Sequence, residues 1–210
     1  MSSMKITPNK IKVAKQIRSK LLTWGFVDDL LYREFKRFPK NVRLDEVAYK
    51  TCLIDKLYNC NVWRLIRGDY GRLAEHIISL KIDPDLTAGN IQIVDEISRF
   101  QGRNLLVFAS KYAHFHQPYK FPIWDNFVAI GLNHILYGKK HYGKRSYAQF
   151  KSDIDGLINN YHRNFGSKLS YKDLDIYLWL YGQKINEFKG ASKEVKDLNE
   201  KHPALFKQLL

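Results

Sequence analysis

Apolar residues recur along this chain at spacings of three and four positions, the pattern of helices that bury one face. This periodicity predicts helices over residues 11–25, 27–38, 45–53, 65–82, 91–102, 104–115, 123–137, 147–161 and 174–181, with a weaker one over 194–210. Ser170 is expected to cap the helix after it, because a serine hydroxyl accepts from the free N–H groups of a first turn. The short strand candidate Ile91–Val94 also fits a helix, so we predict an all-α fold.

No internal repeat and no Gly/Ser-rich or Pro-rich linker divides the chain. We therefore expect one helical domain over residues 1–210, a compact multi-helix fold of two helical lobes that flank a cleft. The best boundary between the lobes is Asp83–Asn90, where Pro, Thr, Gly and Asn cluster and interrupt the helical pattern.

The charge balance points to a polyanionic partner. The chain has 35 Lys and Arg against 21 Asp and Glu, a formal net charge of +14. Nucleic acid is the commonest partner of such a protein. The basic residues are spread along the sequence, which indicates a folded basic surface rather than a flexible arm.

The cysteines and the lengths of the apolar runs narrow the class of protein. Cys52 and Cys60 are eight positions apart, too far to bridge if they share a helix, so they do not indicate a disulfide framework. No apolar run approaches the ~20 residues of a membrane span, and the first ten residues lack the apolar core of a signal peptide. We expect a monomeric cytoplasmic protein, associated with the nucleoid if the source is a bacterium.

Candidate chemistry is concentrated in residues 104–128. Lys111 lies on an otherwise apolar helix, where it either extends its stem to the surface or is held in the interior for a purpose. Desolvation lowers the pKa of a lysine and makes its neutral amine available as a nucleophile. Asp125 follows Pro122 at the start of the next helix, where the positive helix end favours an ionised carboxylate. These two side chains are expected to face one cleft.

The segments F-A-S-K-Y at 108–112 and F-P-I-W-D at 121–125 resemble the helix-hairpin-helix DNA glycosylase superfamily. They are most similar to its divergent 8-oxoguanine DNA glycosylase-like branch, including the archaeal type. The resemblance covers about residues 91–135, with a weaker similarity at 171–182.

This resemblance implies base excision from double-stranded DNA, with an oxidised purine flipped out of the duplex and no cofactor. In this family an aspartate stabilises the oxocarbenium-like sugar or orients the nucleophile, a role that maps onto Asp125. In bifunctional members a lysine attacks the sugar, forms a Schiff base and can cut the strand by β-elimination; Lys111 is the candidate here. The candidates for the base pocket are Tyr112, His114, Phe115, His116, Phe121 and Trp124.

The DNA backbone has its own candidates. The stretch G-K-K-H-Y-G-K-R at 138–145 combines basic side chains with a tyrosine, which suits a phosphate clamp with a stacking ring. We expect backbone contacts from Arg103, Asn104, Lys139, Lys140, Lys144 and Arg145.

The sequence departs from the family in two respects. Of the usual glycine-rich hairpin only Gln101-Gly102-Arg103 remains, which puts its contact with a DNA phosphate in question. The family lysine normally opens the helix, where this chain has Asn104, and Lys111 comes two turns later. Either Lys111 has taken over the role, or Asp125 acts alone with water, or only nucleic-acid binding remains.

Several alternatives stay open. Asp125 also suits a simple helix cap, and the scaffold suits a non-catalytic DNA- or RNA-binding protein. A nuclease needs clustered carboxylates for a metal, for which the aspartates at 153, 155, 173 and 175 make a weak case. His114 and His116, two apart on a helix, point in different directions, so we expect no metal site.

Overall fold

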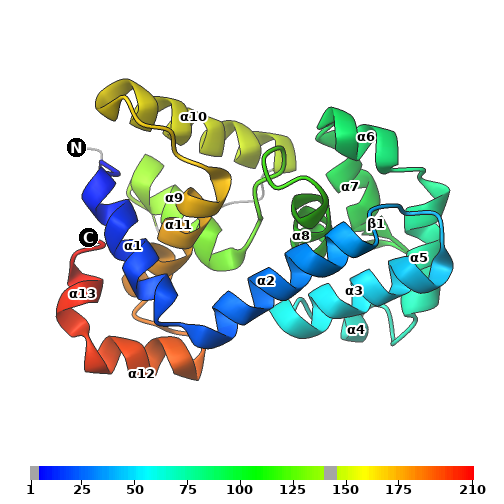
Figure 1. Ribbon diagram of the computed structural model, residues 1–210, viewed down its shortest axis with the longest axis horizontal. Helices are drawn as coiled ribbons and strands as arrows, with labels where there is room; N and C mark the ends of the chain where they lie inside the picture. The colour runs from blue at the N-terminus through cyan, green and yellow to red at the C-terminus, as the bar shows by residue number, and fades with distance from the viewer. Residues whose placement is uncertain (1–4, 140–145) are drawn as a thin grey trace. The chain divides into compact units, whose positions relative to one another are not determined.

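The predicted all-α fold is confirmed by the computed structural model, which describes residues 5–139 and 146–210 (Figure 1). Its helices are α1 (Pro8–Ser19), α2 (Leu22–Arg37), α3 (Leu44–Tyr58), α4 (Val62–Leu65), α5 (Tyr70–Ser79), α6 (Asp83–Ala88), α7 (Gln92–Ser98), α8 (Leu106–His116), α9 (Asn126–Tyr137), α10 (Tyr147–Phe165), α11 (Tyr171–Ile185), α12 (Lys193–Lys201) and α13 (Pro203–Lys207). The strands β1 (Arg99–Phe100) and β2 (Arg103–Asn104) form one antiparallel pair.

The chain divides into two compact units. Unit 1 combines the residues up to Phe26 with those from Asp125 onward, and unit 2 is Val27–Trp124. The boundary expected at Asp83–Asn90 therefore lies inside unit 2, where its first six residues form α6. Proline and glycine there start and end a short helix rather than a linker: Pro84 sits in the first turn, and Gly89 ends the helix in the left-handed conformation.

The core of unit 1 is the crossing of α9 and α11, where two glycines bring the helix backbones together. A Cβ built on Gly182 would come within 1.9 Å of the Phe127 carbonyl oxygen, and one on Gly131 within 2.6 Å of the Leu178 oxygen. No larger residue fits this contact. Helix α1 packs on α11, and α13 lies beside α1 at the C-terminal end of the chain (Figure 1).

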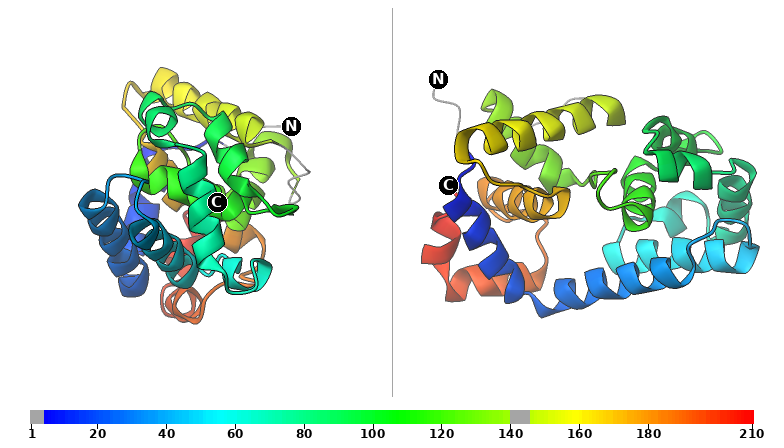
Figure 2. Two further views of the ribbon diagram at one scale, coloured as in Figure 1. Left: turned by 90° about the vertical axis from the view of Figure 1, so that its right-hand side faces the viewer. Right: turned by 45° about the horizontal axis from the view of Figure 1, so that its top comes forward.

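Unit 2 is built around α8. Helix α3 packs against α5 and α8, and α7 packs against α8 (Figure 2). The residues of α8 from Phe108 through Phe115 are buried without interruption, so this helix is enclosed on all sides. This enclosure decides the surroundings of Lys111, which lies in the middle of that run.

Several predicted helix ends move in the structure. The first helix ends at Ser19 rather than near Gly25, because the Arg18 guanidinium donates to the carbonyl oxygens of Leu21 and Trp24 as α2 begins. The stretch 65–82 contains the end of α4 and all of α5, separated by a turn at Arg67 and Gly68 in which both residues have a positive φ. Ser170 caps α11 as predicted, with its hydroxyl accepting from the Asp173 N–H at 3.1 Å.

Among the described residues, no helix is both long enough and apolar enough to cross a membrane.

Candidate functional site

A β-hairpin joins α7 to α8. Arg99 pairs with Asn104 and Phe100 with Arg103, so the loop consists of Gln101 and Gly102 alone. Both loop residues have a positive φ, 47° and 71°, as a type I′ turn requires. Around Gln101-Gly102-Arg103 the structure thus has a short β-hairpin, and the two helices that it joins, α7 and α8, pack on each other.

Lys111 is in the interior of unit 2. Lys111 is only 1% exposed, so its side chain does not reach the surface, which was one of the two positions that the sequence allowed. Its amine lies 5.1 Å from the centroid of the Tyr58 ring, within the range of a cation–π contact. The Tyr58 hydroxyl donates to the Asp28 carboxylate, which is itself 6% exposed. The lysine therefore lies beside an aromatic ring whose hydroxyl is bonded to a buried carboxylate.

Asp125 caps α9 rather than lying in its first turn as the sequence suggested. Its carboxylate accepts from the Phe127 N–H at 2.9 Å, and the helix begins only at Asn126. The residues from Pro122 to Trp124 are outside the helix, because Trp124 N–H and Ser110 Oγ pair at 3.0 Å and hold this segment to α8. The cap fixes one oxygen of the half-buried carboxylate at the helix start.

Four of the six residues expected to line a base pocket are core residues of unit 2. Tyr112, His114 and Phe121 are 0% exposed and Phe115 is 4% exposed. His114 is held from both sides: its Nδ1 lies 2.8 Å from the Phe121 carbonyl oxygen and its Nε2 lies 2.7 Å from the Tyr32 hydroxyl. Because a carbonyl oxygen only accepts, Nδ1 donates and a neutral ring accepts from Tyr32 through Nε2. The other two, His116 and Trp124, are partly exposed.

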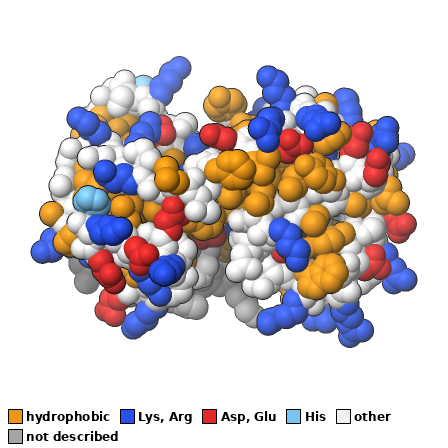
Figure 3. Space-filling model, turned by 60° about the horizontal axis from the view of Figure 1, so that its bottom comes forward, with side chains coloured by type: hydrophobic (Ala, Val, Ile, Leu, Met, Phe, Trp, Pro, Cys, Tyr) orange, Lys and Arg blue, Asp and Glu red, His pale blue; other side chains and the backbone are white. Residues whose placement is uncertain are grey.

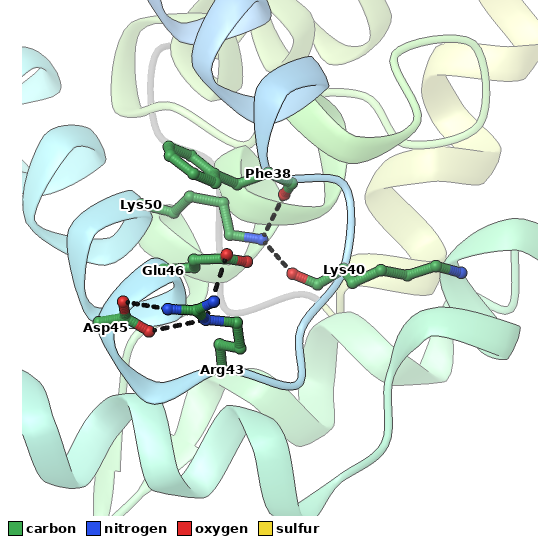
Figure 4. Close-up of polar contacts among 6 residues, drawn as sticks. All are labelled: Phe38, Lys40, Arg43, Asp45, Glu46 and Lys50. Carbon is green, nitrogen blue, oxygen red and sulfur yellow. Dashed lines mark hydrogen bonds and ion pairs between the residues drawn. The ribbon is translucent and has the colours of Figure 1, made fainter.

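A buried lysine that the sequence analysis did not single out lies on α3. Lys50 is 0% exposed, and its ammonium donates to the carbonyl oxygens of Phe38 and Lys40, each at 2.9 Å (Figure 4). It also donates to Asn41 Oδ1 at 2.8 Å. All three of its N–H groups are thereby satisfied. A signal existed in the sequence, because position 50 falls on the buried face of α3 between Val47 and Ile54.

Other polar groups complete this cluster. Tyr112 donates its hydroxyl to Asn41 Oδ1 at 2.5 Å, and Asn41 donates its amide to Asp83 Oδ1 at 2.6 Å. His116 Nε2 lies 3.3 Å from the Lys50 amine. The cluster ties the segment after α2 to α3, α6 and α8 of the same unit.

Burial dominates the electrostatics of the cluster. It lowers the pKa of Lys50 to about 8, against the opposing charges of Asp83 and Glu46. It also lowers the pKa of His116 well below its ordinary value, and the neighbouring Lys50 charge adds to this effect. Burial raises the pKa of the Tyr112 hydroxyl, as does the charge of Asp83. Since Lys50 is enclosed and fully hydrogen-bonded, its arrangement suits a structural clamp rather than a nucleophile.

The expected DNA-backbone residues divide into described and undescribed ones. Arg103, Asn104 and Lys139 are exposed, and the Asn104 side chain accepts from the Leu106 N–H at 3.0 Å where α8 begins. Lys140, Lys144 and Arg145 lie outside the described residues. Figure 3 shows basic side chains dispersed over one face of the molecule with acidic ones between them.

Three of the four aspartates considered for a nuclease are engaged with basic groups, and the fourth, Asp153, accepts from the Gln149 amide at 2.9 Å. Asp155 pairs with Lys151 at 2.7 Å and accepts from the Tyr171 hydroxyl, Asp173 pairs with Lys15 at 2.8 Å, and Asp175 lies 3.8 Å from Lys172. Within residues 5–139 and 146–210, no group of three or more His, Cys, Asp or Glu side chains is arranged to hold a metal ion.

The fold defines an all-α protein in which a short β-hairpin joins α7 and α8. The chain belongs to the HI_0787_N family, described as an N-terminal domain, which matches residues 9–120 and hence more than half of its length. The matched region includes Lys111 and ends before Asp125.

A protein of Haemophilus influenzae, named only as an uncharacterized protein, is 30% identical over 125 residues. The match covers 54% of this chain and 57% of the relative, so it spans little more than half of either protein. No solved structure matches the chain.

Proposed function

We propose that this protein is a DNA glycosylase that removes a damaged base, an oxidised purine by the resemblance of residues 91–135, in base-excision repair. The observation that carries the proposal is Lys111, buried on α8, the helix that follows the β1–β2 hairpin, in a protein of net charge +14. A buried lysine is uncommon unless it is paired or functional. The proposal rests on that residue together with the capping carboxylate of Asp125.

In the proposed reaction the Lys111 amine attacks C1′ of the deoxyribose as the bond from C1′ to the base breaks. The base leaves with the bonding electron pair and takes up a proton. Asp125 stabilises the positive charge that develops on the sugar during this step. The nitrogen then loses a proton and the C1′–O4′ bond opens, with O4′ taking up a proton, which gives a Schiff base. Loss of a proton from C2′ expels the 3′ phosphate by β-elimination, which cuts the strand.

The surroundings of the lysine support a nucleophilic role. The proposed step uses the neutral amine, because only the neutral amine attacks carbon. The Tyr58 ring lies against the amine, and its own position is held by the hydrogen bond from its hydroxyl to Asp28. If Lys111 does not react, Asp125 with water gives the monofunctional reaction, which releases the base and leaves an abasic site.

The second candidate is a non-catalytic DNA- or RNA-binding protein on the same scaffold. Two observations favour it: Lys111 is only 1% exposed, and the Asp125 carboxylate already caps α9. In this case the basic surface binds nucleic acid and neither residue takes part in chemistry.

Borohydride trapping distinguishes the two. The purified protein is incubated with an 8-oxoguanine duplex and with an abasic duplex, beside Lys111→Gln, Asp125→Asn and the control Lys120→Gln. An adduct that is lost in Lys111→Gln and kept in Lys120→Gln identifies Lys111 as the nucleophile. Free base without an adduct assigns the monofunctional reaction.

Release of no base and formation of no adduct, with salt-sensitive DNA binding, overturns the glycosylase proposal in favour of the binding protein. Because Lys111 is buried, the far-ultraviolet circular dichroism and thermal unfolding of Lys111→Gln must show that the variant is folded before its loss of activity counts.

A further inference from the structure

A surface hollow of about 390 Å³ in unit 2 lies beside the β1–β2 turn. Three arginines from three different elements line it. Arg67 belongs to the turn between α4 and α5, Arg72 to the start of α5, and Arg103 to β2. Asp69 and Gln101 complete the polar part of the lining.

The turn that carries Arg67 is held in place by its neighbours. Arg67 and Gly68 both have a positive φ, 54° and 82°. The Gly68 N–H donates to the Trp63 carbonyl oxygen at 2.9 Å, and a Cβ on Gly68 would come within 2.7 Å of the Trp63 ring. The Asp69 N–H donates to the Ile66 oxygen at 3.2 Å. A turn fixed in this way presents Arg67 without the entropy cost of ordering a loop.

The single carboxylate of the hollow is committed to its own helix. Asp69 accepts from the Arg72 N–H at 3.0 Å as the cap of α5, and its other oxygen lies 3.2 Å from the Arg72 guanidinium. Arg72 is thereby oriented. Within residues 5–139 and 146–210, Arg67 and Arg103 form no ion pair, so the hollow has a surplus of positive charge.

We propose that this hollow binds the phosphate groups of a nucleic-acid strand, with Arg67 and Arg103 as the main contacts and Arg72 held beside them by Asp69. A guanidinium matches a phosphate with two parallel N–H···O bonds, and it stays charged at any working pH. The strong positive charge of the chain favours a polyanion over a single small anion. The inference rests on the nucleic-acid part of the proposed function and is independent of its chemistry.

The test is a salt titration of binding to a short fluorescent DNA duplex. The double variant Arg67→Gln/Arg103→Gln is compared with Arg33→Gln/Arg43→Gln, which removes the same charge from two arginines of unit 2 that pair with Glu34, Asp45 and Glu46. The first variant is expected to bind about tenfold more weakly and to reduce the slope of log affinity against log salt by about 2, because each lost phosphate contact removes about 0.9. The control keeps the wild-type slope.

Equal slopes for the two double variants, or no duplex binding by the wild type, overturn the proposal. An Arg67→Lys/Arg103→Lys variant keeps the charge, and intermediate binding by it supports two-point recognition. Inorganic phosphate, added as a competitor at constant ionic strength, tests whether the hollow binds a free phosphate ion instead of a strand. If phosphate displaces the duplex as well as unlabelled duplex does, the hollow holds a free anion and the strand proposal fails.

These outcomes separate the inference from the proposed reaction. If the wild type releases base and the arginine variants bind DNA as the wild type does, the phosphate-binding role of the hollow is rejected and the glycosylase proposal stands. Salt-sensitive binding that depends on Arg67 and Arg103, without release of any base, supports the hollow and rejects the glycosylase.

Discussion

The Lys50 ammonium donates to the side-chain oxygen of Asn41 at 2.8 Å in the interior of unit 2. The side-chain amide of Asn41 in turn donates a hydrogen bond to the Asp83 carboxylate. A single positive charge on α3 thus joins the segment after α2 to the first turn of α6. Removing one member of such a network leaves its partners buried without hydrogen bonds, which costs more than the bond itself contributes.

We expect Lys50→Met to lower the free energy of unfolding by about 3–5 kcal/mol, because a buried network that loses its charged member leaves oxygens without donors. Urea unfolding at pH 7 measures this. Lys40→Met is the matched control, since its side chain is exposed and only its backbone oxygen accepts from Lys50. A loss of less than about 1 kcal/mol in Lys50→Met contradicts the clamp.

The stability of unit 2 should depend on pH through the same residue. Burial lowers the pKa of Lys50 to about 8 in the folded protein, whereas an ordinary lysine has 10.5. Between these values the unfolded chain binds a proton that the folded protein has released, so stability rises with pH in this window and is flat below it. The unfolding free energy of the wild type should therefore rise relative to that of Lys50→Met from about pH 7.5 to about pH 9.5. A constant difference across this range rejects the lowered pKa.

Gly182→Ala should open the crossing of α9 and α11. The added methyl group would come within 1.9 Å of the Phe127 carbonyl oxygen, and a backbone atom of a packed helix has no room to withdraw. We expect a loss of about 2–3 kcal/mol or more, as in other overpacked cores. Gly156→Ala on α10 is the control: nothing lies within 4 Å of its Cβ position. That change should leave stability the same or raise it by up to about 1 kcal/mol. Thermal unfolding of both variants decides the matter.

Asp125 has a structural role as a cap and a proposed role in catalysis, which two substitutions separate. Asparagine caps a helix as well as aspartate, so Asp125→Asn should keep the wild-type stability, whereas Asp125→Ala should lose about 1 kcal/mol. If the carboxylate stabilises the reacting sugar, both variants should release base at least about 100-fold more slowly. Single-turnover kinetics on the 8-oxoguanine duplex measure this rate. An Asp125→Asn variant with wild-type turnover shows a cap and nothing more.

The helical content and several helix ends follow from local chemistry alone. Ser170 was predicted as a cap and is one, because the hydroxyl and the N–H groups it serves are neighbours in sequence. The break after Ser19 does not follow from apolar spacing, because the Arg18 guanidinium that supports it reaches to Trp24 in the first turn of the next helix. Apolar periodicity carries no information about such a contact.

The fold class, the positive charge, and the presence of a lysine on an apolar helix and of an aspartate at the start of the next one can all be predicted from the sequence. These properties depend on residues close in sequence or on sums over the chain. The packing of the helices is needed to show that Lys111 and Lys50 are enclosed, that Tyr112, His114, Phe115 and Phe121 fill a core, and that three arginines line one hollow. Whether a side chain is buried, and whether residues distant in sequence meet, depends on which helices pack together. The spacing of residues along one helix does not predict that packing.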